Sequence, residues 1–205
     1  ADECYVTLGW DVEPRSLLHP EISGPDHTGL LAVHSLSTRS NLAGLRIGWV
    51  RASAPQVQRL AAARVGVDMG SPVLDQLVAV RLLAGAGPIV AARRAELVPR
   101  RDALLAALAE FLPDWRVTVP RGGLTLWVEL DGPISSALAR AAEEVGVRLA
   151  PGPRFGLDGT LERFLRLPFT LPAAELTEAV RRIAAVRYDL DQAARPGWRE
   201  PVVIA

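Results

Sequence analysis

The apolar positions of the first fifty residues form short continuous runs. Residues 30–35 and 45–50 each predict one strand, and a polar segment between Ser37 and Gly44 separates them. Residues 5–8 are also prone to form a strand, and a loop rich in proline and glycine follows them. Because continuous apolar runs are typical of strands buried on both faces, we expect a parallel or mixed sheet covered by helices.

From Pro55 onward the apolar spacing becomes helical and predicts three helices, the third over residues 89–112. Pro72 suits the start of the second helix. Pro99 should bend the third helix, which could bridge two domains. The apolar stripes are Val57, Leu60 and Ala61 in the first helix, Leu74, Leu77, Val78 and Leu82 in the second, and Leu97, Leu104, Leu105, Leu108 and Phe111 in the third.

The remainder of the chain predicts a small α+β unit. Strict alternation of apolar and polar residues over positions 124–130 indicates a strand with two distinct faces, with a shorter strand at 116–119 and a turn at 121–123 before it. A helix to about Val145 follows, with Val145 inward, and then a strand at 147–150 and a loop at 151–156. A strand at 164–169 and a helix to about Tyr188 complete the unit.

Composition narrows the class of protein. The chain has 205 residues, of which 49% are hydrophobic, but no apolar run reaches the ~20 residues that a membrane-spanning helix needs. Its 23 basic and 23 acidic residues cancel, so overall charge favours neither nucleic acid nor a membrane as a partner. A start without signal-peptide character and a single cysteine favour a soluble cytoplasmic protein. All 23 basic residues are arginines, so chemistry that needs a lysine amine is excluded.

Three short segments could carry chemistry. The first is Asp2-x-x-Tyr5. The second runs from His34 to Arg46 and contains Ser35-Leu36-Ser37-Thr38 and Gly44-Leu45-Arg46, and the third is Arg166 within an apolar strand. Each segment alone has a simpler interpretation: a turn with a buried ring, a strand end whose hydroxyls satisfy backbone groups, or arginines in structural ion pairs. Only the set and its order argue for a shared function.

This order of motifs resembles that of the class I/II, fold-type I, pyridoxal-phosphate (PLP)-dependent aminotransferases. The first 50 or so residues are most similar to succinyldiaminopimelate aminotransferase, and the remainder to the aminotransferase-like domain of MocR-type regulators of the GntR family. The resemblance implies an α/β fold. Residues 1–92 would form the second half of the cofactor-binding large domain, with a mixed sheet and helices. Residues 93–192 would form a small α+β domain, and residues 193–205 a tail. Members of the family have, before the Asp-x-x-Tyr motif, a segment roughly as long as this whole chain. A fragment of a longer protein and a truncated or recombined gene would both explain this difference in length.

The resemblance also implies roles for single residues. Asp2 would face the pyridine nitrogen of PLP and keep it protonated, and Arg166 would bind the α-carboxylate of an amino acid or 2-oxo acid. The remaining cofactor contacts would be Tyr5 to the ring hydroxyl and Ser35, Ser37 and Arg46 to the phosphate. A homodimer is the expected assembly.

The departure from the family is Thr38, which occupies the position of the Schiff-base lysine. A threonine hydroxyl is neither a useful base at neutral pH nor able to hold the cofactor covalently, and the neighbouring Arg39 stays protonated. We therefore expect non-covalent PLP binding at best and negligible transamination. Two alternatives stay open: the effector-sensing domain of a MocR/GntR-type regulator, and a remnant with a packing role only.

Other reactive residues carry less weight. Cys4 has no visible histidine partner and is interpreted as an inert apolar residue. His19, His27 and His34 lack the spacing of metal ligands, so no metal site is predicted. The loop at 151–156 lacks the lysine of a phosphate-binding P-loop and is interpreted as a small-domain loop that faces the substrate.

Overall fold

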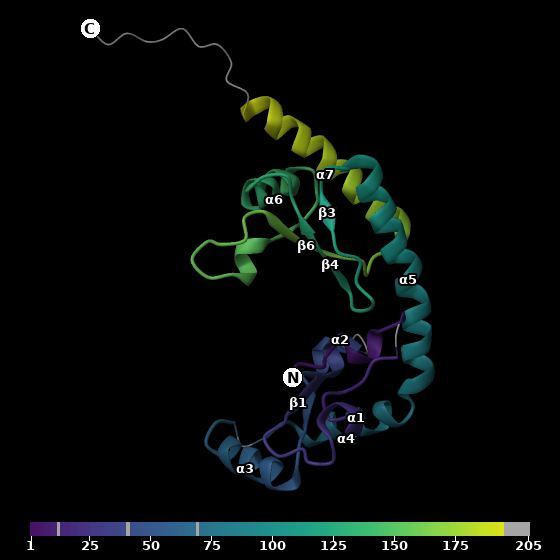
Figure 1. The fold of residues 1–205 in the computed structure, drawn as a ribbon, viewed down its shortest axis with the longest axis vertical. Coiled ribbons are helices and arrows are strands. Elements are labelled where there is room, and N and C mark those ends of the chain that lie inside the picture. The colour runs from purple at the N-terminus through teal and green to yellow at the C-terminus, as the bar shows by residue number, and fades with distance from the viewer. Residues whose placement is uncertain (12, 40–41, 69, 195–205) are drawn as a thin grey trace, which may run out of the picture. The chain divides into compact units, whose positions relative to one another are not determined.

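The computed structural model describes residues 1–11, 13–39, 42–68 and 70–194. Its contacts divide the chain into two compact units, which are described separately (Figure 1). Unit 1 comprises Ala1–Val98 with Pro120–Leu124, and unit 2 comprises Pro99–Val119 with Thr125–Ala205. The predicted tail lies for the most part outside the described residues, and Ala193 and Ala194 close the last helix.

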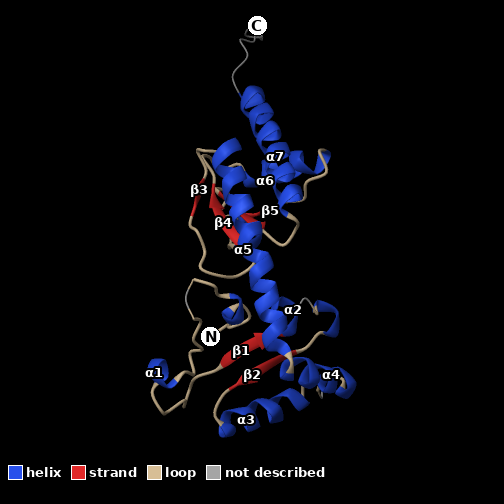
Figure 2. Cartoon of the chain, turned by 90° about the vertical axis from the view of Figure 1, so that its right-hand side faces the viewer, coloured by secondary structure: helices blue, strands red, loops and turns tan. Residues whose placement is uncertain are grey.

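Unit 1 is built around a small sheet. The strands β1 (Ala32–Ser35) and β2 (Gly48–Arg51) are antiparallel, and residues 1–3 run parallel to β1 through a bridge between Asp2 and Val33 (Figure 2). The helical elements are η1 (Val6–Leu8), α1 (Pro20–Ser23), α2 (Leu36–Arg39), η2 (Ala43–Leu45), α3 (Ala54–Val65), α4 (Val73–Ala84) and the first part of α5 (Ala86–Phe111).

The predicted strand at residues 5–8 is wrong, because η1 occupies this segment. The amides of Val6 and Leu8 donate to the carbonyls of Glu3 and Tyr5, so they close local turns instead of pairing with a neighbouring strand. The prediction that β1 and β2 are buried on both faces is also wrong. The side chains of Val33 and Val50 are 44% and 41% exposed within the described residues.

The core of unit 1 joins α4 to α2 and β2. Leu36, Ile47 and Ala79 form a buried cluster, and the partly buried residues packed on it are Leu42, Leu45, Trp49 and Leu83. The predicted apolar stripes of α3 and α4 do not face this cluster: Val57, Leu60, Leu74, Leu77 and Val78 are all exposed. The helical spacing was therefore correct for secondary structure, but Ala79 and Leu83 are the residues of α4 that reach the core.

The turn at residues 120–124 packs against η1 in unit 1. Gly9 and Gly122 form an antiparallel bridge, and the Gly123 amide donates to the Leu8 carbonyl at 3.1 Å. A Cβ on Gly122 would lie 2.7 Å from the carbonyl oxygen of Leu8 and 2.8 Å from Cα of Gly9, both of them backbone atoms. This close approach explains why a glycine occupies position 122.

Unit 2 is an antiparallel sheet whose long helices lie on one face. The strand order is β3-β4-β6-β5, with β3 (Arg116–Val117), β4 (Thr125–Glu129), β5 (Ala150–Pro151) and β6 (Phe164–Pro168). The helices are the second part of α5, α6 (Ser135–Glu144), η3 (Gly152–Phe155) and α7 (Ala173–Ala194). The two-faced strand is confirmed: Leu126 and Val128 are buried and Trp127 is exposed. Val145 was expected to point inward, but it lies past the end of α6 and is exposed.

The helix α5 contributes to both units. Leu97, Leu104 and Leu108 of its predicted stripe are buried, and Pro99 lies inside the helix, at the first residue of unit 2. Among the described residues, no single helix has the length and apolar composition to cross a membrane. The pair α4 and α5 would meet those criteria together, with a bend of 73° between them.

Candidate functional site

The first predicted segment runs alongside β1. The Val33 amide donates to the Ala1 carbonyl at 2.9 Å, and the Glu3 amide donates to the Val33 carbonyl at 2.8 Å. Because this segment is parallel to β1, it approaches the carboxyl end of that strand as it proceeds. Tyr5 therefore follows the segment at the carboxyl end of β1.

The second predicted segment lies at the same end. Ser35 is the last residue of β1 and pairs with Gly48, the first residue of the antiparallel strand β2. Ser37 and Thr38 follow in α2, and Arg46 precedes β2 by two residues. Backbone pairing thus places Ser35, Ser37 and Arg46 at the carboxyl end of β1, where ligands bind in many α/β sheets, whereas Asp2 lies beside Val33 within the strand.

Asp2 is held as a carboxylate by its local contacts. Its Oδ1 atom accepts a hydrogen bond from the Cys4 amide at 2.9 Å. Hydrogen bonds from the Cys4 side chain and amide hold the pKa of Asp2 below its usual range. Burial, followed by the hydrogen bond to Asp2, raises the pKa of the Cys4 thiol to about 11. Asp2 is therefore ionised at neutral pH, whereas Cys4 stays protonated and is a poor nucleophile, as its sequence context indicated.

The hydroxyls after β1 are organised by a local turn. The Ser37 amide donates to Oγ of Ser35 at 3.1 Å, so the Ser35 hydroxyl accepts this bond and keeps its own proton for another acceptor. Thr38 is the third residue of α2 and is half-buried. Its hydroxyl occupies the place where the family resemblance calls for an amine.

Arg46 lies in a left-handed conformation with φ 52° and ψ 36° and ends η2. Its guanidinium donates to the Ala43 carbonyl at 3.0 Å, and the residue is exposed. One hydrogen bond leaves most of the five guanidinium N–H donors available to an external anion. Arg46 is therefore suited to bind a phosphate.

Asp2 and Tyr5 line a hollow of about 450 Å³ in unit 1. Arg15, Arg121 and Gly122 also line it, the last two from the turn that packs against η1. Tyr5 is 44% exposed, so the residue is accessible from outside the unit. Glu3 lines it too, so the hollow combines two carboxylates, one phenol and two guanidinium groups, of which that of Arg15 is paired with Glu21.

A buried acid–histidine pair, whose Glu3 also lines this hollow, was missed by the sequence interpretation. Oε1 of Glu3 accepts hydrogen bonds from the Leu17 amide at 2.6 Å and the Ser16 hydroxyl at 3.0 Å, and its Oε2 lies 3.5 Å from Nε2 of His34. The His34 ring stacks on Trp49, with 5.1 Å between ring centroids. The alternation along β1 was an available signal, since Ala32 and His34 share its buried face.

Arg166 belongs to unit 2, where it lies on the face of the sheet opposite the long helices and beside Phe155 of η3. It pairs with Trp127 of β4 and with Ala150 of β5, and its neighbours Leu165 and Leu167 are buried on the opposite face. Among the described residues, Arg166 has neither an ion pair nor a side-chain hydrogen bond. The alternative that Arg166 is a structural ion-pair partner is therefore not realised within unit 2.

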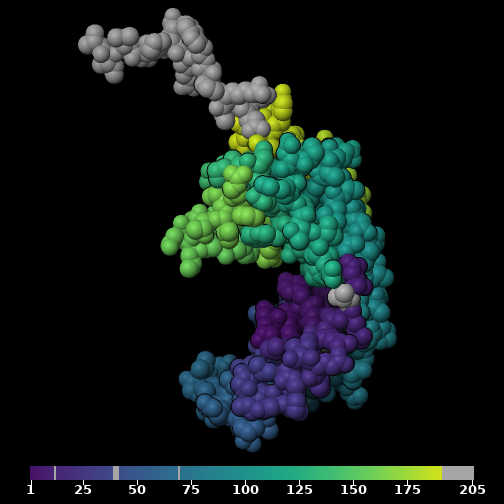
Figure 3. Space-filling view, in the orientation of Figure 1, coloured from purple at the N-terminus to yellow at the C-terminus, as the bar shows by residue number. Residues whose placement is uncertain are grey.

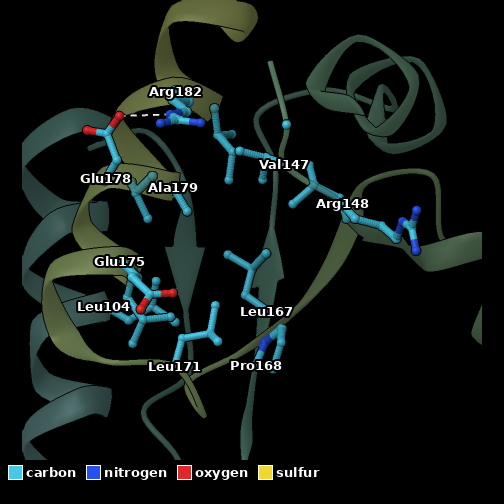
Figure 4. Close-up of a pocket in the computed structure, with 15 residues that line it drawn as sticks. Leu104, Val147, Arg148, Leu167, Pro168, Leu171, Glu175, Glu178, Ala179 and Arg182 are labelled. Carbon is cyan, nitrogen blue, oxygen red and sulfur yellow. Dashed lines mark hydrogen bonds and ion pairs between the residues drawn. The ribbon is translucent and has the colours of Figure 1, made fainter. Parts of the chain in front are cut away.

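A separate pocket of unit 2 lies on the other face of β6 (Figure 4). Leu104, Leu167 and Leu171 point into it, and it has a volume of about 330 Å³. Arg182 at its rim pairs with Glu178 at 2.7 Å. None of the predicted site residues lines this pocket, whose interior is mainly apolar.

The residues at the end of β1 fit a phosphate-bearing pyridine cofactor, with one exception. An ionised Asp2 suits a protonated ring nitrogen, and the Ser35 hydroxyl and the exposed Arg46 suit a phosphate. Thr38 does not fit covalent attachment, since only an amine can form the required bond. The site is therefore suited to non-covalent retention of the cofactor.

Solved structures establish the class of fold. The α-aminoadipate aminotransferase LysN from Thermus thermophilus, complexed with N-(5'-phosphopyridoxyl)-L-leucine, superposes with a TM-score of 0.83 at 29% identity; the match covers 94% of this chain and 50% of that one. The fold is thus part of that of the PLP-dependent aminotransferases. More narrowly, the chain belongs to the family of class I and II aminotransferases, whose model matches residues 1–183.

Curated relatives agree with this assignment. A probable aminotransferase of Mycobacterium tuberculosis is 38% identical over 183 residues, which are 89% of this chain and 42% of the relative. The 4-dedimethylamino-4-oxo-anhydrotetracycline transaminase OxyQ of Streptomyces rimosus is 36% identical over 182 residues, which are 89% of this chain and 49% of the relative. The chain therefore spans about half the length of the curated relatives it matches.

Proposed function

We propose that this chain supplies part of a PLP-binding site of the kind used for amino group transfer between an amino acid and a 2-oxo acid. We also propose that the chain, with threonine at position 38, does not catalyse this transfer. When bound, the cofactor carries the amino group between the two substrates. The observation that supports the site is the convergence of the Asp2, Ser35 and Arg46 segments on the carboxyl end of β1. The observation against catalysis is Thr38 at the lysine position.

Each residue has a distinct task in this proposal. The Asp2 carboxylate holds a proton at the ring nitrogen, and Tyr5 donates a hydrogen bond to the ring hydroxyl. Ser35, Ser37 and Arg46 bind the phosphate. Arg166 takes the α-carboxylate of the substrate through its paired N–H donors.

Thr38 removes two functions together. The family resemblance assigns the lysine both the covalent bond to the cofactor and the transfer of a proton from the substrate Cα. An alcohol with a pKa far above neutral performs neither, and the sequence contains no lysine elsewhere that could substitute. The relatives described above are named as aminotransferases, which favours a descendant of an enzyme over the sensory domain of a regulator. Homodimer formation and a cytoplasmic location are part of this proposal.

A titration with PLP tests the proposal. The chain is mixed with PLP and followed by absorbance, reduced with borohydride, and mapped by mass spectrometry of its peptides. We expect no adduct at position 38 in the unchanged chain. Thr38→Lys should gain one when the half of the family domain that this chain does not cover is supplied as a second polypeptide.

Arg39→Lys is the matched control, because it places an amine one position away without changing the net charge. Peptide mapping separates an adduct at position 38 from reaction of the Ala1 amine. A borohydride-stable adduct within residues 36–40 of the unchanged chain would overturn the assignment of Thr38. Equal labelling of Thr38→Lys and Arg39→Lys would refute the placement of the lysine position.

A further inference from the structure

The outward face of the sheet in unit 2 carries a cluster of aromatic rings around one arginine. Alternation along β4 and β6 directs Trp127, Phe164 and Arg166 to this face, and buries Leu126, Val128, Leu165 and Leu167 on the other. Trp127 and Arg166 are direct partners across the two strands. Directly opposite side chains on adjacent strands lie close enough to bind one small ligand together.

The rings are arranged as two walls. Trp127 stacks on Phe164, with 5.4 Å between centroids and 12° between planes. Phe155 of η3 meets Trp127 edge to face, with 5.7 Å between centroids and 83° between planes. Trp127 and Phe155 are 38% and 45% exposed, so a large part of each ring stays open to an incoming group.

Phe155 also holds the arginine. Cζ of Arg166 lies 5.1 Å from the centroid of the Phe155 ring, which is within the range of a cation–π contact. Such a contact uses the flat face of the guanidinium and leaves the N–H donors, which lie in its plane, available to a carboxylate. Phe155 is thus a positioning residue for Arg166.

Close packing fixes the turn that carries Phe155. A Cβ on Gly152, the first residue of η3, would lie 2.9 Å from both the carbonyl carbon of Leu161 and the carbonyl oxygen of Phe164. The turn therefore sits directly on the backbone at the start of β6. In the space-filling view, the light green segment that includes η3 projects from the body of unit 2 (Figure 3).

The charge of Arg166 distinguishes it from nearby arginines. Arg116 pairs with Glu129 at 3.2 Å, and Arg187 pairs with Asp131 at 2.6 Å. Arg166 has no carboxylate partner within the part of the chain that the structure describes. An arginine that is placed over a ring and lacks an anion is suited to take a carboxylate from a ligand.

From these contacts we propose that Arg166, Phe155 and Trp127 form a binding site for carboxylates that bear an aromatic or large apolar group. The guanidinium binds the carboxylate, and the exposed rings contact the remainder of the ligand. This inference rests on the proposed function, because it adds side-chain selectivity to the carboxylate role of Arg166. Glu129 lies on the same face, already paired with Arg116, and does not favour a second carboxylate on the ligand.

Calorimetric titration of the whole chain with three unreactive acids tests the inference. 3-Phenylpropionate carries one carboxylate and one ring, butyrate carries the carboxylate with a short alkyl chain, and glutarate carries two carboxylates. We expect 3-phenylpropionate to bind about tenfold more tightly than butyrate or glutarate, since aromatic contacts add to the burial of the ring. Equal binding of the three acids, or preference for glutarate, would overturn the selectivity; the latter would point to Arg154, which precedes Phe155.

Variants separate this inference from the proposed function. Arg166→Gln should weaken both 3-phenylpropionate and butyrate at least about tenfold, because the charged partner of the carboxylate is lost. Trp127→Leu should reduce the preference for 3-phenylpropionate about threefold to tenfold and leave butyrate binding nearly unchanged. Phe155→Leu should weaken both acids, because it removes a ring wall and the support of Arg166.

Arg148→Gln is the matched control, since Arg148 is exposed and lines the pocket on the other face of β6. Thermal unfolding of each variant confirms that the fold is retained. If Arg166→Gln binds both acids as well as the unchanged chain does, the carboxylate role in the proposed function fails. If Arg166→Gln abolishes binding but Trp127→Leu keeps the ratio between the acids, only the selectivity fails.

Discussion

Glu162 caps the helix α6 from a distance in sequence, and its replacement tests how much this cap contributes to stability. The N-cap residue Ile134 has no side-chain hydrogen bond to offer. Instead, the Glu162 carboxylate accepts from the Ser136 hydroxyl at 2.6 Å, the Ser135 hydroxyl at 2.9 Å and the Ser136 amide at 3.0 Å. A negative charge at this position also interacts favourably with the N-terminal end of the helix dipole.

Glu162→Gln keeps the size of the side chain and removes the charge, and it should cost about 1 kcal/mol of unfolding free energy, from the weaker capping bonds and the lost dipole term. Glu162→Ala should cost about 2–3 kcal/mol, because the fully buried Ser135 hydroxyl also loses its partner. Urea denaturation at pH 7, followed by circular dichroism, measures both differences. Glu144→Gln is the control, since a negative charge at the other end of α6 is unfavourable and its removal should cost nothing.

The pH dependence gives an independent check. The hydrogen bond from the Ser136 hydroxyl, followed by that from its amide, lowers the pKa of Glu162 in the folded state. A lowered folded pKa means that the stabilisation is complete above the unfolded value, about 4.3, and is lost as the pH falls through the folded value. The difference between the unchanged chain and Glu162→Gln should therefore shrink below about pH 4. A difference that stays constant from neutral to acid pH, or an equal cost for Glu144→Gln, would refute the capping role.

Three further predictions concern packing and reactivity. Gly152→Ala should destabilise unit 2 by about 1–3 kcal/mol in urea denaturation, whereas Gly132→Ala, whose added Cβ meets only ordinary contacts, should be tolerated. Phe169→Ala should cost about 3–5 kcal/mol in the same assay because Phe169 is fully buried, and a cost under 1 kcal/mol would contradict this. Cys4 should react with iodoacetamide at pH 8 roughly a hundredfold more slowly than a free thiol, since its pKa is raised to about 11. Asp2→Asn should accelerate the reaction in part, because the hydrogen bond to Asp2 contributes to the raised pKa. A rate equal to that of a free thiol would show that Cys4 is not shielded.

The elements of unit 2 could be predicted because each has a polar and an apolar face of its own. The alternation at residues 124–130 predicts that Leu126 and Val128 are buried, whichever strands lie beside this one, and the structure confirms this burial. The same reasoning failed at residues 5–8. A β-prone segment forms a strand only beside a suitable partner, and here the amides of Val6 and Leu8 bond to nearby carbonyls instead.

Contacts between residues distant in sequence could not be predicted. Glu162 caps a helix that begins 27 residues earlier, and no local pattern announces this. The buried Glu3 carboxylate accepts hydrogen bonds from Ser16 and Leu17, and these contacts also depend on how a loop folds back. The motif order did identify the family, and the structure shows that the segments of Asp2 and Ser35 meet at one strand end. The assignment of single residues to cofactor atoms stays a prediction.

The pairing in unit 1 restricts where its small sheet can be enlarged. Strand β1 is occupied along both edges, by β2 on one side and by residues 1–3 on the other. Within the described residues, the outer edge of β2 has no paired strand. Any polypeptide that adds a strand to this sheet must therefore pair with the outer edge of β2 or lie beyond residues 1–3. Val33 and Val50 are direct partners on one face of the sheet and both are exposed, so that face is open to a covering layer.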